Sequence, residues 1–258
     1  MTGGTAPASR GEAAAQASRI AVWDAPIRLY HWAQLALVCG AYYTQWLMSP
    51  SADPTMRWHR WCGYGILVLL VFRLLWGFAG SATARFASFI PSPGAILRYA
   101  GQLARGRAPK FLGHNPFGAL MVSALLLLLA AQALSGLFTA DSNGIFGGPF
   151  GHFDMLEESP AWKAGLQRWH HRGANILLAF IAIHVLVNLF YQFVRRDRLV
   201  TAMVTGVKPA GDYADDVAGQ SHVAARIPAR ALTLRAILCL AAALIVVFGG
   251  LFLGGGKL

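Results

Sequence analysis

Hydrophobic residues in this chain fall into five long blocks that are separated by polar connections. The blocks cover residues 29–48, 58–78, 116–138, 170–194 and 232–253. Each block has about the 20 residues that an α-helix needs to cross a hydrocarbon core of ~30 Å. The pattern predicts an all-α membrane protein in which a bundle of four transmembrane helices is followed by a fifth, C-terminal transmembrane helix.

The polar stretches divide the chain into four parts. Residues 1–19 are rich in Ala, Gly, Ser and Thr and contain no apolar run, so we expect a flexible tail and not a signal peptide. Residues 20–205 hold the first four predicted helices and form the main transmembrane domain. Residues 206–231 are predicted to be a cytoplasmic linker, and residues 232–258 to be the extra helix with a short tail.

Composition and charge exclude other classes of protein. Of the 258 residues, 56% are hydrophobic and 13% are charged, which is typical neither of a soluble enzyme nor of a disordered chain. The net charge of +11 could mark a nucleic-acid binder, but the basic residues lie mainly between the hydrophobic blocks. We interpret them as an orientation signal and expect no nucleic-acid partner.

The basic residues predict which side each connection faces. The connections 79–115 and 195–231 together carry 11 of the 22 Lys and Arg residues, and the first of these connections contains no acidic residue. Both connections should therefore face the cytoplasm, which puts the N-terminus inside and, after five crossings, the C-terminus outside. The acidic segment 139–169 then lies on the outer side.

Cysteine and histidine positions narrow the chemistry. The three cysteines lie far apart and no Cys-x-x-Cys-His motif occurs, so any haem would be b-type, held by ligation and packing alone. Five histidines lie within hydrophobic blocks: His31, His59, His170 and His184, together with His171 directly beside His170. Ionisable side chains are costly in a bilayer and usually functional, although a single histidine often only bonds a neighbouring helix.

Spacing pairs these histidines by depth. His170 and His184 are 14 residues apart, which returns to within about 40° of one helix face and separates them by about 21 Å along the axis. His171 lies about 140° from His184, so we favour His170 as the ligand and keep His171 as the alternative. His59 is level with the outer His170, and His31 with the inner His184.

Two facing imidazoles in each of two layers are the arrangement that holds two six-coordinate haems, one above the other. Zinc favours more ligands per layer. Arg73 follows His59 by 14 residues and returns to the same face at about the depth of the inner pair. It either binds a propionate of the inner haem or extends to the cytoplasmic interface.

Several segments resemble the prokaryotic cytochrome b561 family. The segment 59–73, which begins His-Arg-Trp-Cys-Gly and ends in Arg, resembles the second helix of that family. The segment 169–184 resembles its fourth helix and the segment 29–32 its first. The family's relatives include the b-type cytochrome subunits of membrane-bound nickel-iron hydrogenases, and residues 22–28 look like the entry to their first helix.

The resemblance implies a four-helix di-haem core in the bacterial cytoplasmic (inner) membrane, which moves electrons between a quinone pool and a redox partner. It assigns His31 and His184 to one haem b, and His59 and His170 to the other. The implied partner is a cytochrome c or a dehydrogenase or hydrogenase subunit that docks on the outer face. The chain departs from the family at His171, where many members have Glu, and in its fifth helix.

Two other functions stay open on the sequence alone. The same di-haem fold could act as an oxidoreductase that oxidises superoxide or quinol, and a basic funnel above the outer haem would support this; the candidate residues are Arg57, Arg60, Arg168 and Arg172. A haem-free transporter or metal-binding subunit is the weaker hypothesis, because the five blocks contain no Asp or Glu and the chain has no His-Glu-x-x-His motif.

Overall fold

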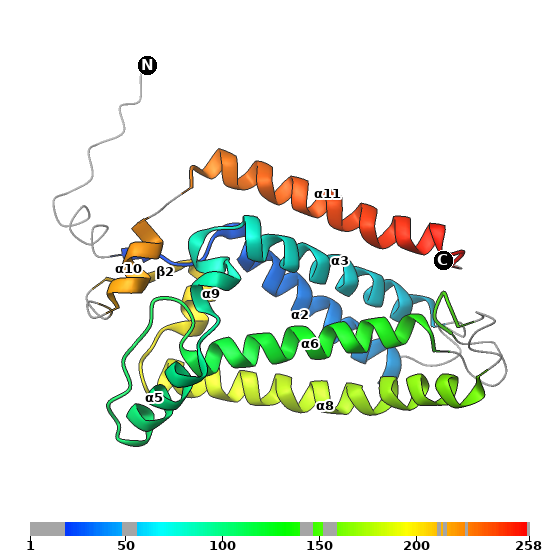
Figure 1. Cartoon of the computed structure of the whole chain (residues 1–258), viewed down its shortest axis with the longest axis horizontal. Helices are drawn as coiled ribbons and strands as arrows, with labels where there is room; N and C mark the ends of the chain where they lie inside the picture. Colours follow the sequence, from blue (N-terminus) through cyan, green and yellow to red (C-terminus); the bar gives the residue numbers. More distant parts are fainter. Residues whose placement is uncertain are drawn as a thin grey trace, which may run out of the picture.

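The chain folds into a bundle of long helices with smaller elements gathered at one end (Figure 1). The computed structural model describes residues 19–47, 56–139, 147–151, 159–210, 213, 216–224 and 227–256. The long helices are α2 (Ala25–Trp46), α3 (Arg57–Ala79), α6 (Pro116–Leu137), α8 (Pro160–Phe193) and α11 (Ala229–Leu253). The short elements are β1 (Arg19–Ala21), η1 (Ala82–Ala84), α4 (Phe86–Phe89), α5 (Pro93–Ala104), α9 (Leu199–Thr205), β2 (Val207–Pro209) and α10 (Val217–Ala224).

Local sequence signals determine where two of the long helices begin. The Asp24 carboxylate accepts a hydrogen bond from the backbone N–H of Ile27 at 2.7 Å, and the Asn115 side chain caps α6 in the same way through the N–H of Gly118 at 2.7 Å. Proline follows in the first turn of both helices. Its missing N–H would have no partner there in any case, so the capping residue and the proline together favour a helix start.

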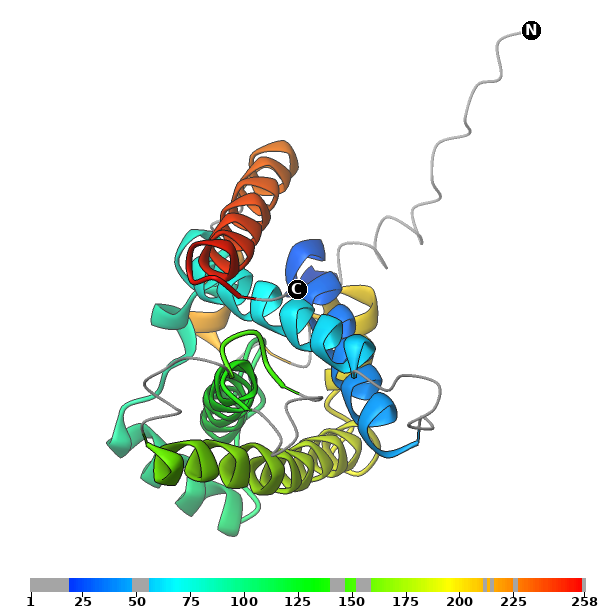
Figure 2. The same cartoon turned by 90° about the vertical axis from the view of Figure 1, so that its right-hand side faces the viewer.

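The helices pack in a chain of neighbours that closes around an interior. Helix α2 packs on α3, α3 on α6, and α6 on α8. Seen along the bundle, α8 lies opposite the α2–α3 pair, and α11 lies on the outside of α3 (Figure 2). The face of α11 that packs inward consists of Cys239, Ala243, Val247 and Leu251.

Four described helices are long and apolar enough to cross a membrane, namely α3, α6, α8 and α11. Their apolar parts coincide with four of the blocks in the sequence. Helix α2 is not among the four: it has 22 residues, but Arg28, His31 and Gln34 lower the hydropathy of its first half. A fifth crossing by α2 therefore stays a prediction.

Helix α8 begins ten residues earlier than the hydrophobic block that predicted it. It has 34 residues and is thus about 51 Å long, more than a ~30 Å hydrocarbon core requires. The additional turns, 160–169, contain polar residues among good helix formers, so hydropathy did not detect them. The N-terminal end of α8, residues 160–169, consequently extends beyond the apolar layer.

A small folded cap closes the end of the bundle that carries β1 and β2. These strands pair antiparallel, with Arg19 opposite Pro209. The Lys208 ammonium is fully buried, lies 3.3 Å from a carboxylate oxygen of Asp197 and donates to the carbonyl oxygen of Phe111 at 2.8 Å. Burial lowers the pKa of Lys208, and Asp197 opposes that shift. The segment predicted as a linker, 206–231, thus contains β2 and α10.

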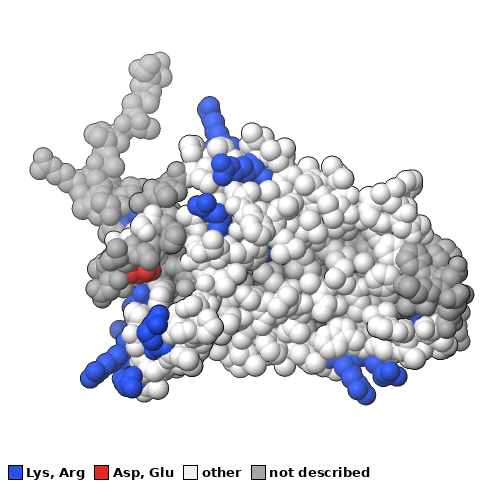
Figure 3. Space-filling view, viewed as in Figure 1, with Lys and Arg blue, Asp and Glu red and all other residues white. Residues whose placement is uncertain are grey.

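Charged side chains concentrate at the cap end and at the extended end of α8. Figure 3 shows Lys and Arg at both places and little charge on the helical surface between them. Exposed basic residues from the connections near the cap include Arg85, Arg98, Arg105, Arg107 and Arg198. An uncharged middle with charged ends is the surface that a membrane-spanning bundle needs.

Candidate functional site

His59 of α3 and His170 of α8 face each other towards the end of the bundle away from the cap. Their ring centroids are 6.1 Å apart and the ring planes are nearly perpendicular, at 89°. The Nδ1 of His59 lies 3.0 Å from the carbonyl oxygen of Ala41, and the Nδ1 of His170 lies 3.0 Å from that of Gln132. A ring whose Nδ1–H donates to a carbonyl has Nε2 available as a metal ligand, and such bonds commonly orient metal-binding histidines.

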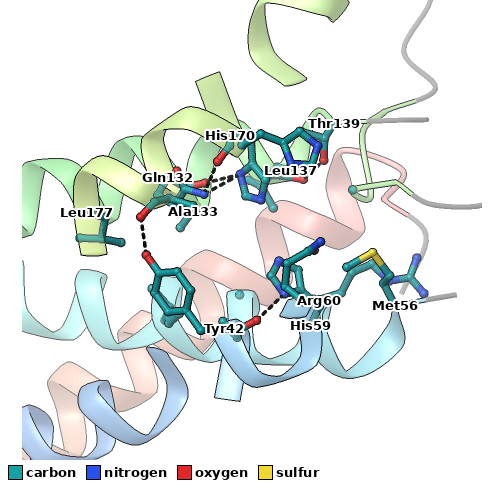
Figure 4. A pocket seen from close by; sticks show the side chains of 18 of the residues that line it. Tyr42, Met56, His59, Arg60, Gln132, Ala133, Leu137, Thr139, His170 and Leu177 are labelled. Atoms are coloured by element: carbon teal, nitrogen blue, oxygen red, sulfur yellow. Dashed lines mark hydrogen bonds between the residues drawn. The ribbon is translucent and has the colours of Figure 1, made fainter. Parts of the chain in front are cut away.

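Both rings line a cavity of about 600 Å³ in the interior of the bundle (Figure 4). Its walls come mainly from α2, α3, α6, α8 and the segment 147–149, and they include apolar side chains such as Leu177. Tyr42 closes one side, where its hydroxyl donates to the carbonyl oxygen of Ala174 at 2.5 Å. A concave, mainly apolar site with a few converging polar groups is typical of cofactor binding. We call this space the outer cavity.

Small residues shape the walls of the outer cavity. A Cβ on Gly136 of α6 would come 2.8 Å from Cε1 of His170, so this glycine makes room for the ring. A Cβ on Gly63 of α3, which also lines the cavity, would meet no described atom within 4 Å and would point into open space. Gly136 therefore sets the ring position, and Gly63 leaves the wall accessible to a flat ligand.

A second pair lies closer to the cap, where His31 of α2 faces His184 of α8. The ring centroids are 6.5 Å apart, with the planes at 46°. The Asn188 side chain donates to the carbonyl oxygen of His184 at 2.7 Å and lies 3.3 Å from its Nδ1. The Nδ1 of His31 is buried and has no hydrogen-bond partner among the described residues.

Both separations fit two imidazoles that share one metal ion. A histidine nitrogen binds a metal at about 2 Å and the ring centroid lies roughly 1 Å behind it, so centroids on opposite sides of the ion are about 6 Å apart. In the described part of the chain, no three His, Cys, Asp or Glu side chains come together as metal ligands. Two histidines per layer fit haem iron, whose other four ligands belong to the macrocycle.

A comparison with protein families agrees with two histidine ligands per haem iron. Residues 22–206 match the family model described as prokaryotic cytochrome b561. The chain belongs to the prokaryotic cytochrome b561 family. It is therefore a membrane b-type cytochrome that functions in electron transfer, and its family implies haem b as the cofactor.

Named relatives of this cytochrome are hydrogenase subunits. A probable Ni/Fe-hydrogenase B-type cytochrome subunit of Rhizobium leguminosarum bv. viciae is 23% identical over 80% of this chain and 96% of the relative. The probable Ni/Fe-hydrogenase 1 B-type cytochrome subunit of Escherichia coli K12 is 24% identical over 72% of this chain and 89% of its own length. No solved structure matches the chain significantly.

Arg73 of α3 has a buried side chain that does not extend to the surface of this cytochrome. Its side chain is 3% exposed, and the guanidinium carbon lies 4.7 Å from the ring centroid of Phe86 and 5.8 Å from that of Phe89. One guanidinium nitrogen, NH1, has no hydrogen-bond partner in the described residues. A buried cation with an unsatisfied donor requires an anionic or polar partner.

His114 is a polar residue of the inner layer that sequence reasoning missed. It lies in the connection before α6, with its ring centroid 4.6 Å from that of Phe89 and 4.9 Å from that of Trp23. Its Nδ1 is buried without a partner in the described part of the chain. Burial lowers the pKa of His114 to about 3, and the nearby charges of Arg73, Lys208 and His184 act in the same direction. His114 is therefore neutral at physiological pH.

The other residues predicted near the outer pair lie partly in the outer cavity and partly on the exposed surface of α8. His171 is exposed, although it borders the outer cavity beside His170. Arg60 lines the outer cavity, whereas the side chains of Arg168 and Arg172 are exposed on α8. The acidic residues that were expected to form a docking surface lie outside the described residues: Asp141, Asp154, Glu157 and Glu158.

Proposed function

We propose that this cytochrome transfers single electrons across the bacterial cytoplasmic membrane through two haems b. His59 and His170 bind the outer haem, and His31 and His184 bind the inner one. The observation that supports this proposal is the presence of two facing histidine pairs, whose members on α8 are about 21 Å apart along the helix. Ligation by two histidines leaves no open iron position, which favours electron transfer over oxygen chemistry.

When bound, each haem supplies a one-electron iron couple, and the protein orients it and adjusts its potential. The carbonyl oxygens of Ala41 and Gln132 hold the outer ligands in the required tautomer. Near the inner layer, Arg73 binds a haem propionate with its buried guanidinium. A cation at a propionate stabilises the reduced state, so Arg73 raises the inner potential.

We further propose that the electrons pass between the quinone pool and a redox protein on the outer face. The names of the relatives make a nickel-iron hydrogenase subunit the first candidate for that partner, and a cytochrome c the second. The basic residues near the cap favour a cytoplasmic N-terminus, with α2 as the fifth crossing and the C-terminus outside.

Two adjacent histidines provide a matched test of the ligand assignment. In detergent-purified protein, His170→Ala should retain about half of the haem found in the wild type, measured as pyridine haemochrome per chain. His171→Ala should retain all of it, because that side chain is exposed. Full haem content in His170→Ala, or loss in His171→Ala alone, would reject the assignment.

A further inference from the structure

Tyr64 of α3 is a buried polar side chain that the proposed haem ligation does not use. It is 3% exposed and lines the outer cavity. Its hydroxyl is buried and has no hydrogen-bond partner among the described residues. Buried hydroxyls are nearly always hydrogen-bonded, because an unsatisfied one loses its hydration without compensation. The Tyr64 hydroxyl is therefore suited to a ligand in that cavity.

Arg60 places a positive charge on the same side of the cavity. It lies one helical turn before Tyr64, and residues four apart on a helix share a face. Arg60 also lines the outer cavity, and Figure 4 shows its side chain beside the ring of His59. A guanidinium and a hydroxyl donor next to each other are the groups that bind a carboxylate. The carboxylates of haem are its propionates.

Helix α11 packs against the other side of Tyr64. The ring centroid of Phe248 lies 6.4 Å from that of Tyr64 and 6.2 Å from that of Trp61, and Trp61 lies 5.7 Å from Tyr64. The three rings form a cluster between α3 and α11. Such edge and tilted contacts restrict the orientation of each ring, so Phe248 limits where the Tyr64 hydroxyl can point.

The end of α11 touches the cavity wall at a second place. Gly148 and Pro149 line the outer cavity, and the next residue, Phe150, packs against the end of α11. A Cβ on Gly254 would come 2.9 Å from a ring carbon of Phe150, so the approach is close. The family match ends at residue 206, so α11 is an addition to the shared core.

We propose that Tyr64, with Arg60 beside it, binds a propionate of the outer haem, and that α11 holds Tyr64 in position through Phe248. This inference rests on the proposed two-haem function. A hydrogen bond and a positive charge at the propionate reduce the negative charge that the iron experiences, so both raise the potential of the outer haem. The additional helix thereby adjusts one of the two haems.

The test is a potentiometric titration of the full-length protein in detergent, monitored in the haem visible bands. The variants His31→Ala and His59→Ala show which transition belongs to which haem. Tyr64→Phe keeps the ring contacts and removes only the hydroxyl, so the outer potential should fall while the inner one is unchanged. Tyr43→Phe, on an exposed residue of α2, is the control and should shift neither.

The role of α11 is tested by two phenylalanines on that helix. Phe248→Ala should lower the outer potential in the same direction as Tyr64→Phe. Phe252→Ala should have no effect, because that side chain is 81% exposed and faces away from the bundle. Haem content and thermal unfolding of each variant show whether it folds, and a purely structural role of Tyr64 would leave the potential of Tyr64→Phe unchanged.

The outcomes separate this inference from the function on which it rests. A wild-type protein that binds no haem would reject the proposed function. A wild-type protein with two haems, whose outer potential is the same in Tyr64→Phe, would reject only the role of Tyr64. An unchanged potential in Phe248→Ala together with a lowered one in Tyr64→Phe would reject the role of α11.

Discussion

The two histidine layers differ in how the protein prepares each pair. In the outer layer, both Nδ1 atoms are bonded to backbone carbonyls of neighbouring helices, and the rings border a defined cavity. In the inner layer, the Nδ1 atoms of His31 and His114 and the NH1 of Arg73 are buried without partners among the described residues. Backbone bonds orient the outer rings, whereas buried polar groups from several elements surround the inner pair.

This difference indicates which kind of substitution should affect each layer most. The outer pair depends on close packing around the rings, so added volume should disturb it most. The inner pair depends on the charge and polarity of its surroundings, so removing a charge should alter its potential more than its occupancy.

The largest expected effect is the loss of the outer haem when the space beside His170 is filled. Gly136→Val should displace the ring, because even a Cβ at this position would lie 2.8 Å from it. The variant should lose the outer haem and keep the inner one, which haem content and visible spectra would show. Gly250→Val should keep both haems, because this position of α11 is exposed and an added Cβ would meet no described atom within 4 Å.

A smaller effect is expected from removing the buried charge of the inner layer. Arg73→Gln should lower the potential of the inner haem and leave the outer potential and the haem content unchanged. Arg73→Lys should restore part of the potential, because the charge returns without the planar guanidinium. Arg98→Gln, on the exposed surface of α5, serves as the control in the same redox titration. Equal shifts of both potentials would contradict a local role for Arg73.

The smallest effect concerns acid stability. The pKa of His114 is about 3 in the folded protein and about 6.5 when unfolded, so between these two pH values only the unfolded chain gains this proton. The wild type should therefore lose unfolding free energy as the pH falls from 7, on the order of 2 kcal/mol by pH 5. His114→Gln should lack this loss. Thermal unfolding of both proteins at pH 7 and pH 5 measures the difference, and parallel curves would contradict it.

Hydropathy predicted most of the fold because lipid-facing helices must be apolar along their length. It placed α3, α6 and α11 to within three residues of their observed ends. It missed the first ten residues of α8, whose polar side chains carry no hydropathy signal. It also could not predict the pairing of β1 with β2, since this contact joins residues 19–21 to residues 207–209 and depends on the whole bundle.

Helical periodicity predicted which histidines the structure brings together. A spacing of 14 residues puts His170 and His184 on one face of α8, and depth alone selected their partners on α2 and α3. That these pairs bind iron stays a prediction. His114 and Tyr64 were not foreseen, because the first lies in a connection and the surroundings of the second depend on α11 and on the packing of several helices.

The central claim is that one chain holds two b-type haems, each between two histidines. The most direct measurement is the haem content per chain of the purified wild-type protein, by pyridine haemochrome, together with its dithionite-reduced minus oxidised spectrum. The account predicts about two haems per chain with sharp low-spin b-type bands. A single haem, or none in protein made with an adequate haem supply, would contradict it.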